Sequence, residues 1–327
     1  MDTHPVSANS IGKYFRVNGS SLARQYKNHL SGFEQWDQLQ HAEEWILFED
    51  NIGRFLCLDE VCLSAGELYT VLTNAGAKCQ KGSLVAMIKG VRSDDVCSIL
   101  EKIPLSKRYS VKEITLDMAN NMEKIARIAF PKATIITDRF HVQQLPVDAL
   151  QEMRIKLRWE AIEEENELVK QAKENGEKYI AKTYQNGDTK KQLLARSRYL
   201  LFKTPNKWTS SQKKRSRILF KLFPELHKAY KLTMMFKGIY EHSKTVKEAK
   251  ERLTNWYTII YDSQFKSFIT AANSIISHQE SILAYFINRR TNALAENFNG
   301  KIKAFRAVFR GVRDIAFFLF RVSLIFA

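Results

Sequence analysis

The sequence lacks the features of secreted and membrane-spanning proteins. Its first residues, MDTHPVSANSIGKYF, have neither the basic start nor the apolar core of a secretory signal. No uncharged apolar run approaches the roughly 18 residues that a membrane span needs. The closest, DIAFFLFRVSLIFA at residues 314–327, is short and contains Arg321. We therefore expect a cytoplasmic protein with no membrane partner, whose last segment is a packed helix.

Cysteine is scarce, and its spacing shows no pairing motif. The four residues, Cys57, Cys62, Cys79 and Cys97, form no Cys-x-x-Cys pair, and three of them sit in apolar runs. This pattern predicts buried thiols in a reducing compartment. It argues against a disulfide framework and against a zinc site.

Acidic residues are too few to balance the basic ones. Among 327 residues, 51 Lys and Arg stand against 35 Asp and Glu, which gives a net charge of +16. Such an excess favours a polyanionic partner, with nucleic acid first and an anionic membrane surface second. A basic protein without such a partner is the alternative. The hydrophobic content of 45% is ordinary and predicts a normal buried core.

Residues 1–48 are expected to form a small N-terminal unit. The stretch NSIGKYFRVNGSSLARQYKNHL predicts two short helices around an Asn-Gly turn, with Ser20 or Ser21 as the N-cap of the second. This resembles a helix-turn-helix, and an ordinary helical hairpin fits the same short pattern. A helix-turn-helix would offer four side chains to a DNA groove: Arg24, Gln25, Lys27 and Asn28.

Residues 52–150 predict a mixed β-sheet. Three apolar runs, RFLCLDEVCL, ELYTVLTNA and SLVAMIKGV, are separated by short turns and indicate an antiparallel meander. After a helix at SDDVCSILEKI, the strands VKEITLDM and ATIITD flank a second helix, so they should run parallel. The order βββαβαβ, an α/β mixed five-stranded sheet, is typical of the ribonuclease H-like fold.

Strands are absent from the following region. Residues 151–285 are long charged helical stretches and predict a large all-α insertion domain. Residues 286–327 then return as C-terminal helices of the core. Within the insertion, Trp208 lies in the basic stretch TPNKWTSSQKKRSR. It would either stack on an extruded base or, as is commoner, anchor neighbouring helices.

Two carboxylates occur where the predicted strands should be buried. Asp59 follows the apolar run of the first strand, and Asp117 closes the fourth. A buried carboxylate is costly unless it is paired or binds a metal. These two strands are neighbours in a ribonuclease H-like sheet, so the carboxylates should meet. The alternatives are a turn cap for Asp59 and a helix N-cap for Asp117.

A third carboxylate lies on a helix near the C-terminus. Glu296 shares one helical face with Asn292, Asn299 and Lys303. Together with the two aspartates it would complete an all-oxygen site for Mg²⁺ or Mn²⁺. Two such ions about 3.5–4 Å apart activate the attacking oxygen and stabilise the leaving one in phosphodiester chemistry. A solvated glutamate on a basic helix is the alternative.

Two long blocks resemble a known family. They are ITLDMANNMEKIARIAFPKATIITDRFHV and, after the helical region, RRTNALAENFNGKIKAFRAVFRGVRDIAFFLFRV. They are similar to the DDE transposases of bacterial insertion sequences, in the group often written ISL-three, which is close in plan to the Mutator-like transposases. The resemblance runs from about Phe55 to the C-terminus. Its most specific motifs are a strand that ends in Asp-Arg-Phe-His and a distant Asn-x-x-x-Glu-x-x-Asn.

The resemblance implies a ribonuclease H-like catalytic domain interrupted by an α-helical insertion. It places the catalytic, metal-binding acids at Asp59, Asp117 and Glu296. Asp138 and His141 match the family's Asp-x-x-His signature. They would lie beside the metal carboxylates and orient a ligand, contact the scissile phosphate or fix the neighbouring helix. The alternative for His141 is a direct metal ligand or proton shuttle.

The family resemblance also implies a function and partners. The protein would bind double-stranded DNA at the inverted repeats of its element and in the target, as a homodimer or larger synaptic assembly. Relatives usually carry a Cys-rich zinc segment and a DNA-binding domain before the core, and this sequence has no such cysteine cluster. End recognition would then fall either to the N-terminal unit together with the insertion or to a second polypeptide. A structure-specific nuclease and a non-catalytic DNA-binding derivative are the alternatives. Near the C-terminus, the expected phosphate contacts are Lys301, Lys303, Arg306 and Arg310.

Overall fold

A computed structural model describes residues 1–63, 66–309 and 314–327. The chain divides into two compact units, one made of residues 1–138 and 288–327 and the other of residues 139–287. The second unit begins with the long helix α6 (Arg139–Glu174). This helix runs through residue 150, where the sequence suggested a domain boundary.

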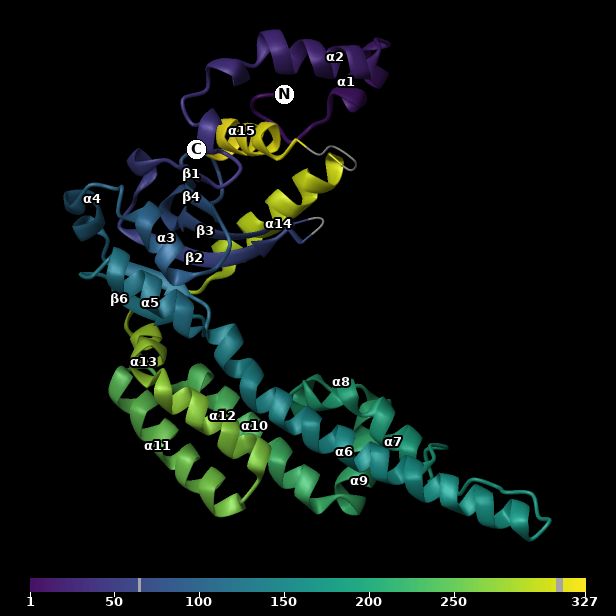
Figure 1. Cartoon of the computed structure of the whole chain (residues 1–327). Helices are drawn as coiled ribbons and strands as arrows, with labels where there is room; N and C mark the ends of the chain where they lie inside the picture. The colour runs from purple at the N-terminus through teal and green to yellow at the C-terminus, as the bar shows by residue number, and fades with distance from the viewer. Residues whose placement is uncertain (64–65, 310–313) are drawn as a thin grey trace. The chain divides into compact units, whose positions relative to one another are not determined.

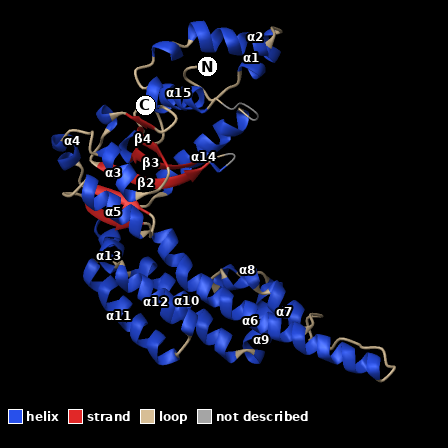
Figure 2. Ribbon diagram, viewed as in Figure 1, coloured by secondary structure: helices blue, strands red, loops and turns tan. Residues whose placement is uncertain are grey.

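A six-stranded mixed sheet forms the centre of the first unit (Figures 1 and 2). The strand order is β1-β4-β3-β2-β5-β6. Strands β2, β3 and β4 pair antiparallel, whereas β5 and β6 continue parallel to β2. The predicted ribonuclease H-like order is therefore confirmed. The strands are β1 (Trp45–Leu47), β2 (Phe55–Cys62), β3 (Leu68–Asn74), β4 (Leu84–Lys89), β5 (Glu113–Leu116) and β6 (Thr134–Thr137).

The predicted number of five strands was one too few. The extra strand, β1, has only three residues, which is too short for an alternating pattern to be recognised. It pairs antiparallel with β4, where Ile46 lies opposite Met87. The amide of Gln38 bonds both the N–H and the C=O of Leu47 at 2.8 and 2.9 Å. These bonds satisfy backbone groups that the strand presents away from its neighbour.

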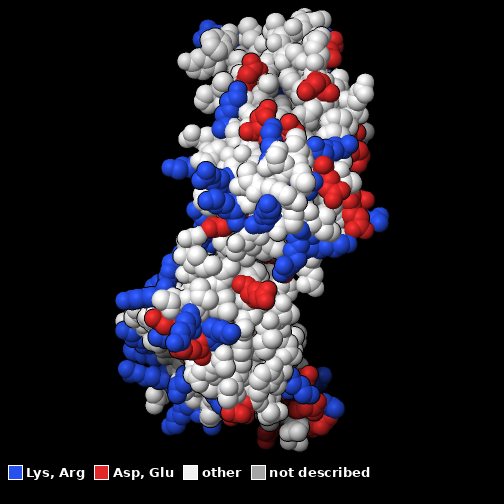
Figure 3. Space-filling model, turned by 90° about the vertical axis from the view of Figure 1, so that its left-hand side faces the viewer, with Lys and Arg blue, Asp and Glu red and all other residues white. Residues whose placement is uncertain are grey.

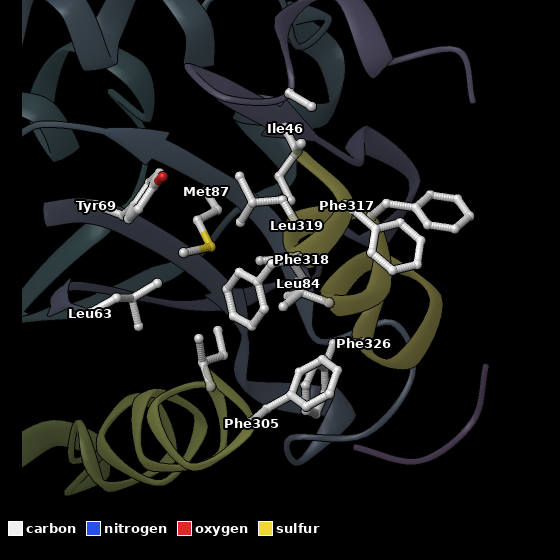
Figure 4. Packing of buried hydrophobic residues seen from close by; sticks show 14 of the residues in the cluster. Ile46, Leu63, Tyr69, Leu84, Met87, Phe305, Phe317, Phe318, Leu319 and Phe326 are labelled. Atoms are coloured by element: carbon white, nitrogen blue, oxygen red, sulfur yellow. The ribbon is translucent and has the colours of Figure 1, made fainter. Parts of the chain in front are cut away.

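Helices cover both faces of the sheet. On one face, α3 (Ser93–Leu100) and α5 (Asn120–Ala129) pack on a core that includes Leu56 and Leu58. On the other, α14 (Ala293–Val308) and α15 (Ile315–Phe326) pack on side chains of β1, β3 and β4 (Figure 4). Because strand side chains alternate, Asp59 points away from the face of Leu58 and toward that of α14.

The C-terminal apolar run forms α15, a buried helix, as predicted. Phe318, Leu319 and Val322 are at most 1% exposed. Arg321 is also fully buried; it donates a hydrogen bond to the backbone oxygen of Met1 at 2.5 Å. Its guanidinium lies 5.2 Å from the ring centre of Tyr26. Among the described residues, no helix combines the length and apolar character that crossing a membrane requires.

The N-terminal residues form two short helices but share the core of the first unit. Helices α1 (Ala8–Phe15) and α2 (Gly19–Gln25) are as expected. The N-cap prediction of Ser20 or Ser21 was wrong, because the Asn18 side chain accepts the bond from the Ser21 N–H at 2.9 Å. Farther on, Phe33 packs edge-on against Phe317 of α15, at 5.1 Å between ring centres. A short helix, α4 (Leu105–Ser110), completes the unit's α-helices.

The second unit is entirely helical apart from one isolated bridge. Trp208 anchors its helices, as the commoner interpretation held. The indole N–H donates to the Leu200 backbone oxygen at 2.7 Å, and the ring packs on Phe220 and Tyr230. After α6 come α7 (Lys190–Arg196), α8 (Arg198–Leu201), α9 (Ser210–Leu222), α10 (Pro224–His242), α11 (Val246–Ser263), α12 (Lys266–Ser277) and α13 (Gln279–Asn288).

One fully buried carboxylate ties three segments of this unit together. Asp188 accepts hydrogen bonds from Arg196 of α7, from Arg215 of α9 at 2.8 Å and from Asn186 at 2.7 Å. Burial alone would raise the pKa of Asp188. The hydrogen bonds and positive charges of Arg215 and Arg196 outweigh that effect and lower the pKa below its usual value.

We expect Asp188→Ala to lower the free energy of unfolding of this unit by about 3 kcal/mol at neutral pH, because it leaves Arg215 unpaired. Because the pKa of Asp188 is lower in the folded state, its ionised carboxylate stabilises that state. This contribution is fully present at pH values above the ordinary pKa of a carboxyl group. That stability is lost as the pH falls through the lowered value. The difference between wild type and variant in urea unfolding should therefore shrink below about pH 4. Asp148→Ala, at an exposed position of α6, is the control and should change little.

Candidate functional site

Three aspartates lie side by side, one inside β2 and the other two directly after the ends of β5 and β6. Leu58 of β2 is in register with Leu116 of β5, and Leu116 with Thr137 of β6. The next residue along each strand direction is Asp59, Asp117 and Asp138, respectively. Neighbouring strands are about 4.8 Å apart, so the three acids form a row across the carboxyl edge of the sheet. Ligands of open α/β sheets commonly bind at this edge.

Helix α14 contacts this row through two asparagines. Asn299 donates from Nδ2 to Asp59 Oδ2 at 2.7 Å and to the backbone oxygen of Glu60 at 3.3 Å. Seven residues earlier, about two turns along the same face, Asn292 donates from Nδ2 to Asp117 Oδ1 at 3.2 Å. The predicted proximity of the two strand aspartates to the C-terminal helix is thus present in the structure.

Asp138 fixes the beginning of the same helix. It is 2% exposed, and its Oδ1 accepts from the backbone N–H of Asn292, the N-cap residue of α14, at 2.9 Å. A carboxylate is favourable there because the first N–H groups of a helix lack partners within it. Of the roles considered for Asp138, the structure supports fixing the neighbouring helix.

Asp117 does not cap the helix that follows it. Helix α5 begins at Asn120 with Ala119 at the N-cap position, and no side-chain bond caps it. Instead, the Asp117 backbone oxygen accepts from the Ala119 N–H at 2.8 Å, which turns the chain after β5. The Asp117 carboxylate accepts the hydrogen bond from Asn292 described above.

Glu296 lies between the two asparagines in the first turn of α14. Residues 292, 296 and 299 are spaced four and three apart, so they share one helical face. The glutamate is exposed. Across the described residues, no group of three or more His, Cys, Asp or Glu side chains stands in an arrangement that could hold a metal ion. The structure thus brings Asp59 and Asp117 to one place but does not gather all three acids.

The oxygen atoms at this place nevertheless suit a hard cation. Within the described part of the chain, Oδ1 of Asn292 and Oδ1 of Asn299 are buried without a hydrogen-bond partner. Together with the carboxylates of Asp59 and Asp117 they offer an all-oxygen set of donors, the set that Mg²⁺ and Mn²⁺ prefer. The helical spacing in the sequence predicts that both asparagines share the face of Glu296, but it predicts no role for them. That spacing around Glu296 is the feature from which a role in the site could have been inferred.

A thiol beside the aspartates is chemically inert. Cys57 lies two residues before Asp59 and therefore faces the same side of β2. Burial raises the pKa of the Cys57 thiol to about 12, and the negative charge of Asp59 adds to the rise. The thiol stays protonated at neutral pH, so it supplies no nucleophile.

His141 belongs to the helical unit. It lies in the first turn of α6, three residues after Asp138, and is partly buried. Its chain neighbour Arg139 donates to the Tyr285 hydroxyl of α13 at 3.2 Å, within the same unit. The role expected for His141 beside the carboxylates remains a prediction.

The predicted phosphate contacts fall into different environments. Lys and Arg side chains gather on the face shown in Figure 3. Arg24 and Lys303 are exposed. Lys301 is exposed as well, although its Nζ donates to the Cys79 backbone oxygen at 2.9 Å. Lys27 is partly buried and pairs with Asp314.

Arg306 differs from the expectation. It is 7% exposed and forms a two-pronged ion pair with Glu67, with Nε and Nη2 at 3.1 and 2.8 Å from the carboxylate oxygens. A guanidinium that is buried and neutralised in this way is not available to a phosphate, so a structural role replaces the predicted one. Arg310 lies outside the described residues.

Comparison with known proteins bears on nearly the whole chain. The family model described as a transposase, the ISL3 group of DDE transposases, matches residues 56–322. Those residues include Asp59, Asp117, Asp138, Glu296 and His141, together with the helical unit. Searches among curated proteins and among solved structures gave no match. By the extent of the family match, this chain belongs to the ISL3 family of DDE transposases.

Proposed function

We propose that the protein is a DNA transposase of an insertion sequence. It hydrolyses a phosphodiester at each inverted-repeat end of its element and joins the freed 3′-OH to target DNA. The observation that carries this proposal is the row of aspartates, Asp59 inside β2 and Asp117 and Asp138 directly after β5 and β6, hydrogen-bonded to α14. Family membership supports the same chemistry.

Asp59 and Asp117 would hold the divalent cations, Mg²⁺ or Mn²⁺, with Glu296 as the third acid. When bound, the cations activate the attacking oxygen and stabilise the leaving one. The side chain of Glu296 projects from the helical face that carries the two asparagines. A rotation about its side-chain torsions would bring its carboxylate toward Asp59 and Asp117. Asp138 sets the position of that face by holding the first turn of α14.

Exposed cations near the site would hold the DNA backbone. Lys301 and Lys303 project from α14, the helix that also carries Glu296. Arg24 offers a further charge on α2. Contacts of this kind bind DNA without reading sequence, and their strength falls steeply with salt. Two ends must be cut together, so a dimer or larger synaptic assembly on DNA is part of the proposal, with a second polypeptide as a further candidate for end recognition.

The test uses purified protein, Mg²⁺ or Mn²⁺, and a DNA fragment that contains the gene's own flanking sequence. We expect cuts at discrete flanking positions that disappear in EDTA, and joined products in which the cut 3′ end is attached to target DNA. Cuts without joined products would instead identify a structure-specific nuclease. Binding without any cut under all metal conditions would identify a DNA-binding derivative and contradict the proposal.

A further inference from the structure

Two asparagines of α14 are buried on either side of Glu296. Asn292 is not exposed at all, and Asn299 is 6% exposed. A buried amide needs partners for two N–H groups and for one oxygen, because each unmet group costs free energy. The groups around these two side chains therefore indicate what the amides are there to bind.

The N–H groups face carboxylates. Asn299 donates to Asp59 at 2.7 Å, and Asn292 donates to Asp117 at 3.2 Å. This orientation follows from charge, because a carboxylate accepts and would repel the amide oxygen. The two bonds also lessen the repulsion between like charges on adjacent strands when no cation is present.

The surroundings of the two amide oxygens differ from those of the N–H groups. Both Oδ1 atoms are buried and lack a hydrogen-bond partner among the described residues. Their dipoles leave partial negative charge next to two carboxylates, at the carboxyl edge of the sheet. An oxygen in that position has its natural partner in a cation or in a water molecule bound to one.

We propose that Asn292 and Asn299 are metal-site residues that act as a pair. Each amide holds one aspartate through its N–H group and directs its own oxygen to the cation site. This deepens the proposed function and rests on it. Neutral oxygens occupy positions around the two aspartates, and Glu296 approaches from the exposed side.

The experiment measures Mn²⁺ binding to the full chain without DNA, by calorimetry and by the loss of the free-ion paramagnetic resonance signal. Asn292→Ala and Asn299→Ala should each raise the Kd for Mn²⁺ about 10-fold, the lower end of the usual effect for groups that support a metal site. Asn297→Ala is the matched control, because this asparagine lies on the same helix but is exposed. It should bind Mn²⁺ like the wild type.

Asn299→Asp is the second variant, and it is nearly isosteric with the wild type. Its response to metal therefore separates an effect on the metal site from an effect of misfolding. The introduced carboxylate faces Asp59 without a donor, so the variant should melt at a lower temperature than wild type in EDTA. Added Mn²⁺ should raise its melting temperature by more than it raises that of wild type. A purely structural asparagine would lower the melting temperature equally with and without the metal.

The outcomes separate the two proposals. If Asn292→Ala and Asn299→Ala bind Mn²⁺ as tightly as wild type while Asp117→Ala does not, the asparagine inference is wrong and the proposed function stands. An equal loss in Asn297→Ala would also overturn the inference, because the effect would not depend on the site. If the wild type binds no Mn²⁺ and cuts no DNA, both proposals fall.

Discussion

Asp59→Asn is expected to abolish metal-dependent DNA cleavage and to leave the fold intact. The substitution keeps the shape of the side chain but removes the charge that would hold a cation beside β2. Loss of several kcal/mol of transition-state stabilisation corresponds to a rate reduction of about 1000-fold or more. The rate of cutting on the flanking-sequence substrate measures it, and circular dichroism with thermal melting verifies the fold.

Glu60→Gln is the matched control for this prediction. Glu60 is the next residue along β2, so its side chain lies on the opposite face of the sheet. There it accepts a hydrogen bond from Asn121 of α5 at 3.3 Å. Cleavage by Glu60→Gln should remain within a few-fold of wild type. Full cleavage by Asp59→Asn would remove Asp59 from the reaction and leave the site proposal without its central carboxylate.

Arg306→Ala is expected to destabilise the first unit by about 3–5 kcal/mol, because it leaves the carboxylate of Glu67 buried and unpaired. The guanidinium also lies 5.2 Å from the ring centre of Phe318, so this one contact between α14 and α15 is lost with it. Urea or thermal unfolding at neutral pH measures the effect. Arg306→Met combined with Glu67→Met should recover much of the stability, since an apolar pair of similar volume often replaces a buried ion pair at little cost.

Lys303→Ala supplies the contrast on the same helix. This side chain is exposed, so its removal should change the free energy of unfolding by no more than about 0.5 kcal/mol. It should weaken DNA binding and reduce the slope of log K against log salt by about 1. If Arg306→Ala instead keeps wild-type stability and shows this DNA phenotype, the sequence-based interpretation of Arg306 as a phosphate contact was right after all.

Local sequence patterns were sufficient to predict features that depend on a single helix or strand or on the connection between neighbouring ones. The apolar run RFLCLDEVCL, the two apolar runs after it and the short turns between them predicted the meander, and strand–helix–strand spacing predicted the parallel continuation. The apolar run around Arg321 predicted a buried helix. Asp59 and Asp117 were identified because a charge at the end of an apolar strand conflicts with burial unless something binds it.

The burial and the partners of individual side chains, by contrast, could not be predicted from the sequence. Arg306 and Lys303 are three residues apart on one basic helix, and nothing in their neighbourhood in the chain separates them. Only the approach of Glu67, 239 residues away along the chain, makes one buried and paired while the other stays exposed. In the same way, Ser20 and Ser21 fit the N-cap preference as well as Asn18 does, and the geometry of the turn chose Asn18.

The sequence by itself determined the order of five of the six described strands, the long helical insertion, the excess of basic charge and the candidate acids, because these depend on period, spacing and composition. The tertiary structure decided which groups meet. It set Asp59, Asp117 and Asp138 in one row through strand register, and it turned Asn292 and Asn299 toward them through the docking of α14. Hydrogen-bond partners so far apart in the chain are fixed by packing across the sheet, which no local pattern encodes.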